Sequence, residues 1–442
     1  MPLRLLTPGR RPMTALYATS VVSVGGHSLT LIAIPWFVLQ STGSPGRTGL
    51  VAFCAAAPVV LSTLFGGPAI DRFGRRRTSV TSDLACGLAT AAVPLLFWAG
   101  ALPFWLLCAL VALAGLLHAP GETARSVMLP DAAERAGTAL ARASGFYQGV
   151  SNAARPAGMA LGGVLIAALG TEAALLIAGG VFVLASLSAL ALRGMPGAEP
   201  LPAAAPLSVR GYAGELREGY AFVLTTPLLL AVIVVLMFSN GTHQGWSAVL
   251  APVHADLHLG GAHALGLLAA ATGVGMALGS LVYGAWGGRL PRWPVFAVCF
   301  LVSGFPRYFT AVLDDGLLAL AVVVAVGSFA AGALNPILFT VLYEVVPAKL
   351  LSRVLGVATA VSLLVTPLGG LAAGGLVEWL GLSPALLVFG TASLLLGLCP
   401  LVFPVWRQLD RTREAVPPVS APGPGRAGAE SPPSRPGPSA GL

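Results

Sequence analysis

The stretch "GGPAIDRFGRRRTSV", Gly66 to Val80, contains a cluster of charged residues in a chain that has few of them. Only 10% of the 442 residues are charged, yet five of the seven residues from Asp71 to Arg77 carry a charge. A charged side chain at the centre of a bilayer costs about 2.5–3.5 kcal/mol on insertion scales. The cluster therefore predicts a polar connector between two apolar segments that cross a membrane.

The composition predicts many such crossings. Apolar residues make up 56% of the chain, and the mean hydropathy is +0.84. A soluble core does not need this much apolar sequence, so we expect most of the chain to face the lipid bilayer. The net charge of +8 sits in short connectors, which argues against nucleic-acid binding. The five cysteines lie inside apolar runs without metal-ligand spacing, so we expect buried thiols and no metal site.

Short charged or Gly/Pro-rich segments divide the chain into apolar stretches of about 20 residues, the length that crosses the hydrocarbon. We expect twelve spans, at approximately residues 14–40, 47–69, 79–100, 102–129, 138–168, 172–193, 226–250, 262–287, 292–313, 316–343, 350–378 and 382–405. The fold class is an all-α membrane protein with two six-helix bundles. Lys and Arg gather in alternate loops, which places both termini in the cytoplasm.

Four segments follow from this division. They are an N-terminal bundle at 1–193, a cytoplasmic linker at 194–225 with room for an interfacial helix, a C-terminal bundle at 226–405, and a disordered Pro-rich tail at 406–442.

The two bundles carry signs of a duplication. Three residues of the first half recur 211 residues later, namely Arg142, Pro156 and Gly170 as Arg353, Pro367 and Gly381. The pair Gly162-Gly163 returns as Gly374-Gly375 at 212, which requires a slip of one residue. Duplicated halves that meet around a midplane site are typical of secondary transporters that work by alternating access.

The charged loop resembles the loop signature of the major facilitator superfamily. The matching residues are Gly67, Asp71, Arg72, Gly74, Arg75 and Arg76. The resemblance implies a gating latch between the cytoplasmic ends of the two halves. We expect Asp71 to meet the start of span eleven, near residues 350–353, only when the cytoplasmic side is shut. The alternative is that the arginines only satisfy the positive-inside rule, which does not account for the acid among them.

Four stretches, one of which contains the loop itself, narrow the resemblance to the macrolide-efflux and enterobactin-exporter branch. They are "SVGGHSLTLIAIPWFVLQSTGS", "GGPAIDRFGRRR", "ARSVMLPD" and "GMALGG". The resemblance implies a proton-coupled exporter of amphipathic organic compounds in a bacterial-type plasma membrane, and we expect a monomer without a cofactor. The alternative function is import of a small polar solute.

An enzyme is not expected, because the chain lacks a phosphate-binding loop and a His-Glu-x-x-His motif. Gly26-His27 and Met159 depart from the branch's usual residues.

Polar residues inside spans are the best candidates for a site, because they are expected to face the bundle interior or a wet cavity. In the superfamily, spans one, four, seven and ten line the cavity. The substrate-binding candidates from spans one, seven and ten are His27, Trp36, Gln40, Asn240, His243, Gln244, Trp246 and Asn335. His27 either titrates, since a free imidazole does so at about pH 6.5, or packs as a neutral ring between helices.

The remaining charges inside spans are candidates for proton coupling or for buried ion pairs. Asp83 either carries a proton or pairs with an arginine. Glu122 is expected to pair with Arg125, three residues along the same helix, or with Arg155 of the next span. Glycines at Gly158, Gly162 and Gly163 are expected to let helices approach closely.

Overall fold

The computed structural model describes residues 11–138, 140–190, 209–347 and 350–410. Within these ranges, some side chains lie outside the description, including those of residues 63–73 and 351–353. In the described part of the chain, twelve helical segments are long and apolar enough to cross a membrane. Each overlaps its expected span, and the largest differences are at the ends of the second and seventh, at Ser62 against residue 69 and Leu257 against residue 250.

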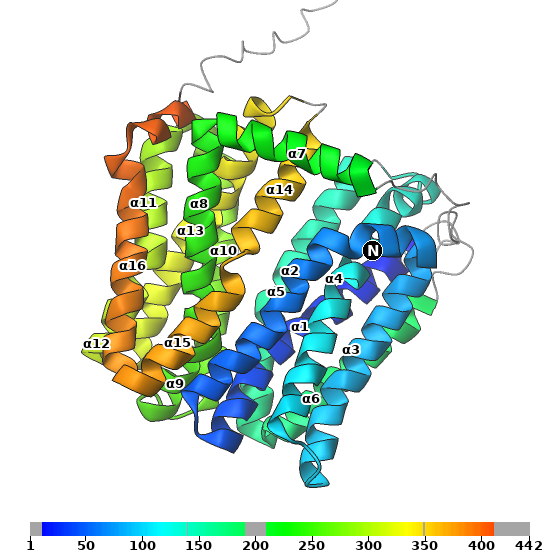
Figure 1. Ribbon diagram of the computed structural model, residues 1–442, viewed down its shortest axis with the longest axis vertical. Helices are drawn as coiled ribbons and strands as arrows, with labels where there is room; N and C mark the ends of the chain where they lie inside the picture. Colours follow the sequence, from blue (N-terminus) through cyan, green and yellow to red (C-terminus); the bar gives the residue numbers. More distant parts are fainter. Residues whose placement is uncertain (1–10, 139, 191–208, 348–349, 411–442) are drawn as a thin grey trace, which may run out of the picture.

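In the described part of the first half, six helices pack together, and Figure 1 shows their arrangement. They are α1 (Arg11–Thr42), α2 (Pro45–Phe73), α3 (Arg75–Trp98), α4 (Phe104–Arg135), α5 (Leu140–Leu169) and α6 (Thr171–Leu190). The turn between α2 and α3 is a single residue, Gly74, whose φ of 83° favours glycine.

The second half begins after α7 (Val209–Thr225), a helix in the expected linker that lies across one end of the bundle (Figure 1). The described helices of the second half are α8 (Pro227–Gly245), α9 (Ala251–Leu257), α10 (Ala262–Trp286), α11 (Arg292–Gly304), α12 (Pro306–Leu313), α13 (Leu317–Val345), α14 (Leu351–Leu363), α15 (Thr366–Leu380) and α16 (Leu382–Val402).

In the described part of the second half, three of the six membrane-spanning stretches are interrupted, which the sequence did not predict. A π-helical turn, Trp246–Leu250, joins α8 to α9. The crossing of α11 and α12 breaks before Pro306, and that of α14 and α15 breaks before Pro367. Proline removes a backbone donor and sits well in the first turn of a helix, so each proline begins a new segment.

The two halves meet at one end of the molecule, here called the distal end, which lies opposite α7 (Figure 1). There α2 packs against α15, and α5 packs against α10. Gly163 faces the backbone of Gly266, and a Cβ on Gly374 would lie only 2.9 Å from Gly49 Cα. Close helix crossings of this kind need small residues.

These helix–helix contacts correct the alignment of the two repeats that the sequence suggested. Gly163 and Gly374 are 211 residues apart and make equivalent contacts across the halves, so no slip is needed. Gly170 and Gly381, which differ by the same offset, end α5 and α15 with φ of 86° and 87°. The two halves are therefore similar in backbone conformation as well as in residue type at these positions.

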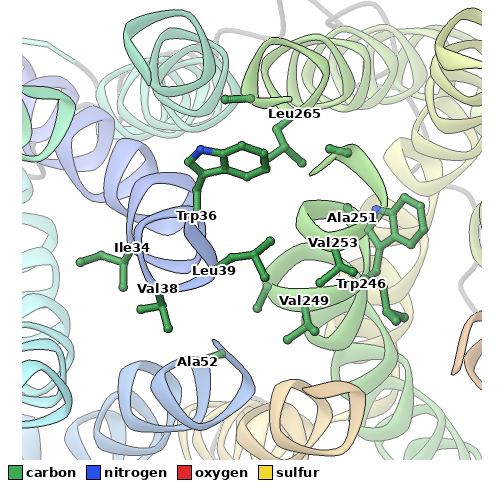
Figure 2. Close-up of a cluster of buried hydrophobic side chains, with 14 of the residues drawn as sticks. Ile34, Trp36, Val38, Leu39, Ala52, Trp246, Val249, Ala251, Val253 and Leu265 are labelled. Carbon is green, nitrogen blue, oxygen red and sulfur yellow. The ribbon is translucent and has the colours of Figure 1, made fainter. Parts of the chain in front are cut away.

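Between the two crossings lies an apolar seal built from both halves (Figure 2). Its members include Ile34, Trp36, Val38, Leu39 and Ala52 from the first half and Trp246, Val249, Ala251, Val253 and Leu265 from the second. All are less than 9% exposed, so the seal excludes water at this end of the molecule.

Polar contacts at the distal end add to the seal. The Glu378 carboxylate of α15 accepts hydrogen bonds from Ser44 Oγ at 3.1 Å and from Gly46 N at 2.9 Å. It thereby caps the first turn of α2, where a negative charge is favourable. Gln40 Nε2 donates to Asp256 Oδ1 at 2.9 Å.

Candidate functional site

A cavity of about 1190 Å³ lies between the two halves on the inner side of the seal. Helices of both halves line it, mostly with apolar side chains such as Val51, Val59 and Leu268. Its polar lining consists of His27, Thr30, Thr90, Arg155, His243, Gln244, Ser247, Thr272, Ser280, Arg307 and Thr366. Among the described residues, no Asp or Glu lines it. A cavity of this size and character suits an amphipathic organic molecule.

A chain of four polar side chains borders the cavity in the first half. The His27 ring of α1 stacks on the His118 ring of α4, with 3.7 Å between centroids. His118 Nε2 lies 3.9 Å from Glu122 Oε2, and Arg155 Nη2 of α5 donates to Glu122 Oε1 at 2.6 Å. Because His27 and Arg155 line the cavity, the chain connects its wall to the packed interior of the half.

Behind this chain, a second ion pair is closed off from the cavity. Arg125 Nη1 donates to Asp83 Oδ2 at 2.7 Å, and the two side chains are 0% and 2% exposed. Ser23 Oγ donates to Asp83 Oδ1 at 2.7 Å and accepts from Arg125 Nη2 at 2.9 Å, while Arg125 also reaches Ser79 Oγ. A buried pair of charges needs such extra hydrogen bonds to offset its desolvation.

The expected pairing of Glu122 with Arg125 along α4 is not present. Arg125 points instead to the carboxylate and hydroxyls of α1 and α3, which together satisfy more of its donors. This leaves Glu122 for Arg155, the other pairing that the sequence allowed.

The second half places one arginine, Arg307 of α12, among aromatic rings. Its Cζ lies 5.5 Å from the Trp246 ring centroid and 5.0 Å from that of Tyr308. Its Nη1 is 3.5 Å from His243 Nδ1, and its Nη2 donates to Tyr308 Oη at 3.3 Å. Tyr308 Oη in turn donates to the carbonyl of Thr242 at 2.8 Å, which fixes the ring.

Of the eight residues proposed from the sequence as substrate contacts, four line the cavity. They are His27, His243, Gln244 and Trp246.

Three others lie away from the cavity in this conformation. Trp36 is 5% exposed within the apolar seal and projects toward Leu265 (Figure 2). Gln40 is at the distal surface, and Asn240 Nδ2 donates to the carbonyl of Ser362. The Asn335 side chain lies outside the described residues.

Comparison with known proteins assigns the family. The model of the Major Facilitator Superfamily matches residues 16–261 and 233–434. This chain belongs to the Major Facilitator Superfamily. It is therefore a multi-pass inner-membrane transporter of small molecules, with its cavity between two bundles of helices.

Within the Major Facilitator Superfamily, similar curated proteins include multidrug efflux pumps. The multidrug efflux pump Tap of Mycobacterium tuberculosis is 31% identical over 409 residues, which cover 92% of this chain and 96% of that protein. Tap of Mycolicibacterium fortuitum is 32% identical over 404 residues, covering 91% and 98%.

Solved structures of other transporters share the fold at low identity. The nucleoside transporter NupG has a TM-score of 0.70 at 15% identity, covering 88% of this chain and 98% of the other. A bacterial homologue of the lysosomal transporter Spinster, inward-facing and unoccupied, has a TM-score of 0.62 at 17% identity, covering 92% and 98%.

The superfamily's loop signature is described only in part. The side chains of Gly67, Asp71 and Arg72 lie outside the described residues, as do those of residues 351–353 at the start of α14, which Asp71 is expected to meet. The latch therefore stays a prediction. In the described part, Arg75 Nη1 lies 3.3 Å from Asp131 Oδ2 of α4, and Arg76 donates to the carbonyls of Ala189 and Leu190 of α6.

Three glycines of α5 make contacts of different kinds. A Cβ on Gly158 would lie 3.0 Å from Gly25 Cα of α1, so this position holds two helices of the same half together. Gly162 would meet Leu29 at an ordinary 3.4 Å, and only Gly163 faces the opposite half.

Sequence reasoning missed His118 and the aromatic partners of Arg307 as parts of the site. A single sequence could have flagged His118, because it stands one helical turn before Glu122 on the same face. No sequence signal brings Arg307 to Trp246, because the two residues belong to different spans.

Proposed function

We propose that this protein exports amphipathic organic compounds, such as drugs, by alternating access, and that it works as a monomer without altering them chemically. The observation that carries the proposal is the large, mainly apolar cavity between the halves, sealed at the distal end. The similarity to multidrug efflux pumps over most of both chains supports the direction and the substrate class.

The proposal places the end with α7 in the cytoplasm. Arginine and lysine gather on the cytoplasmic side of membrane proteins. The order of the helices puts several arginines near the end with α7, namely Arg75, Arg76, Arg135, Arg217 and Arg407. The helices of the two halves diverge toward this end (Figure 1). The conformation is then the one in which an exporter takes up its substrate from the cytoplasm or the inner leaflet.

In alternating access, the protein closes its cytoplasmic end when the distal end opens, and the reverse. In the proposed cycle, Glu378 at the end of α15 holds the start of α2 while the distal end is shut. Asp71, near the opposite end of α2, engages the start of α14 when the cytoplasmic end is shut. The two acids act at opposite ends of the same two membrane spans, α2 and the span formed by α14 and α15. Because the two ends are closed in turn, only one of the acids is engaged at a time.

Protons are the proposed coupling ion, and the polar chain of the first half is the proposed carrier. His27 at the cavity wall, stacked on His118, has access to protons from the cavity. The Glu122–Arg155 pair next to it responds to a change in their charge. Asp83 is a weaker candidate, because Arg125 and Ser23 hold it in a closed network.

The test uses purified protein in liposomes with a fluorescent amphipathic drug and an imposed pH gradient. Export by antiport predicts that drug moves against the direction of proton flow, and that an uncoupler stops it. His27→Ala is expected to abolish the gradient dependence while leaving drug counterflow. Uptake of small polar solutes with no drug movement would favour the import alternative, and chemical conversion without flux would indicate an enzyme.

A further inference from the structure

We propose that Arg307 binds an acidic group of the substrate, so that the transported compounds include amphipathic organic anions such as carboxylates. This inference rests on the proposed transport function and narrows its substrate class. It follows from one feature of the second half, which is an arginine at the cavity wall that faces aromatic rings and a histidine.

The described groups around Arg307 come from α8, the π-helical turn, α11, α12 and α13. His243 and Thr242 belong to α8, Trp246 begins the π-helical turn, and Tyr308 follows Arg307 in α12. Behind it, Gly327 and Ser328 of α13 border a small pocket that Arg307 also lines. Among these described neighbours, none carries a negative charge.

The donors of Arg307 are only partly used. Nη2 donates to Tyr308 Oη, and Nη1 reaches His243 at 3.5 Å, the limit of a hydrogen bond. Nε has no partner in the described structure although it is buried. A guanidinium has five N–H donors in a planar fork, a shape that matches a carboxylate.

The charge of Arg307 is therefore stabilised without being neutralised. Cation–π contacts with two rings contribute about 0.5–2 kcal/mol each, depending on exposure. The other arginine of the cavity wall, Arg155, has Glu122 as its counter-ion. Because the described lining contains no carboxylate, the cavity carries an excess of positive charge on the side of the second half.

The same geometry argues against a cationic substrate at this wall. The Trp246 and Tyr308 rings offer faces to a cation, but Arg307 already occupies that position. A second cation would meet like charge in a medium of low dielectric constant. An anion bound to the free edge of the guanidinium would instead lie beside the aromatic rings, which suit the apolar part of an amphipathic compound.

The experiment compares two ligands that differ in one charge. Dansyl-phenylalanine is anionic at neutral pH, and its methyl ester is neutral with nearly the same shape. Their binding to the full chain in lipid nanodiscs is measured by the rise in dansyl anisotropy. Wild-type protein is expected to bind the acid at least ten times more tightly than the ester, since a charge-assisted pair in a desolvated site contributes at least about that factor.

Three variants assign the effect. Arg307→Gln is expected to lose about ten-fold or more in affinity for the acid and to change ester affinity less than about two-fold. Arg307→Lys, which keeps the charge, is expected to retain part of the preference. Arg407→Gln is the matched control, because Arg407 also lies over a tryptophan, 5.5 Å from the Trp293 ring centroid, but does not line the cavity.

Equal binding of acid and ester by wild-type protein would overturn the inference, and so would an equal loss of both ligands in Arg307→Gln and Arg307→Lys. Drug transport in liposomes is measured on the same preparations. If wild-type protein moves a neutral drug but shows no preference for the acid, only the anion inference fails. If it moves no drug at all, the proposed export function fails.

Discussion

The two halves of this transporter surround the arginines at and behind the cavity wall in opposite ways. In the first half, Arg125 and Arg155 each have a carboxylate, at 2.7 and 2.6 Å. In the second half, Arg307 has two aromatic rings, a histidine and a free donor. Paired charges hold helices together, whereas an unpaired charge at a cavity wall is left for a ligand. If Arg307 binds an anion as proposed, the cavity has a paired, structural arginine in the first half and a recognition arginine in the second.

The largest expected effect comes from breaking the closed pair of the first half. Asp83→Ala leaves Arg125 buried without its counter-ion, which costs about 3–5 kcal/mol. We expect a marked fall in the unfolding temperature of the protein in detergent, measured by scanning fluorimetry of tryptophan emission.

The control for this prediction removes both charges at once. Asp83→Asn combined with Arg125→Gln is expected to recover much of the stability, because no unpaired charge remains. If Asp83→Ala alone unfolds at the wild-type temperature, the pair does not hold α3 to α4 as its burial implies.

The next largest effect tests the feature that the two halves share. Gly374→Ala places a methyl group 2.6 Å from the Pro45 carbonyl oxygen and 2.9 Å from Gly49 Cα, so α2 and α15 must separate. Overpacking of this kind costs about 1–3 kcal/mol, which is expected to favour the conformation open at the distal end. In a cysteine-free background, a cysteine at Val253 in the apolar seal is expected to react faster with a membrane-impermeant maleimide.

Neighbouring glycines provide the matched controls. A Cβ on Gly375 meets nothing within 4 Å, so Gly375→Ala is expected to leave the labelling rate unchanged. Gly163→Ala is expected to act like Gly374→Ala, since it blocks the equivalent crossing between α5 and α10. Equal labelling in Gly374→Ala and Gly375→Ala would mean that the crossing does not control the seal.

A smaller effect is expected when the first half is made to resemble the second. Glu122→Gln removes the counter-ion of Arg155, a partly exposed pair. A free Arg155 at the cavity wall is expected to raise the affinity for dansyl-phenylalanine about three-fold, the scale of a solvent-screened pair. The ester serves as the control ligand, and its affinity is expected to stay the same. A gain for both ligands would point to a change in cavity shape instead of charge.

The sequence predicted the architecture more fully than the site, for physical reasons. Apolar run length fixes where helices cross a membrane, so spans such as 262–287 agree closely with α10, Ala262–Trp286. Spacing along one helix shows only which residues share a face. It could not decide whether Glu122 pairs with Arg125 or Arg155, because that choice depends on what neighbouring helices offer. Trp36 was a candidate for the cavity because it lies in span one, which lines the cavity in the superfamily, yet it packs in the seal.

The smallest expected effect concerns the acid that closes the distal end. Glu378→Gln keeps a hydrogen-bond acceptor for Ser44 and Gly46 but removes the charge at the start of α2. A charge at an exposed helix terminus contributes about 0.3–1 kcal/mol, so the labelling of a cysteine at Val253 is expected to rise only slightly. Glu172→Gln, in the first turn of α6, serves as the control, because it removes a charge from the start of a helix that packs against α1, α3 and α5 of its own half. If the proposed exchange of latches is correct, Asp71→Asn shifts the labelling in the opposite direction from Glu378→Gln, because each acid stabilises a different closure of the same two helices. Shifts of both variants in the same direction would rule out that exchange while leaving the cavity and its arginine untouched.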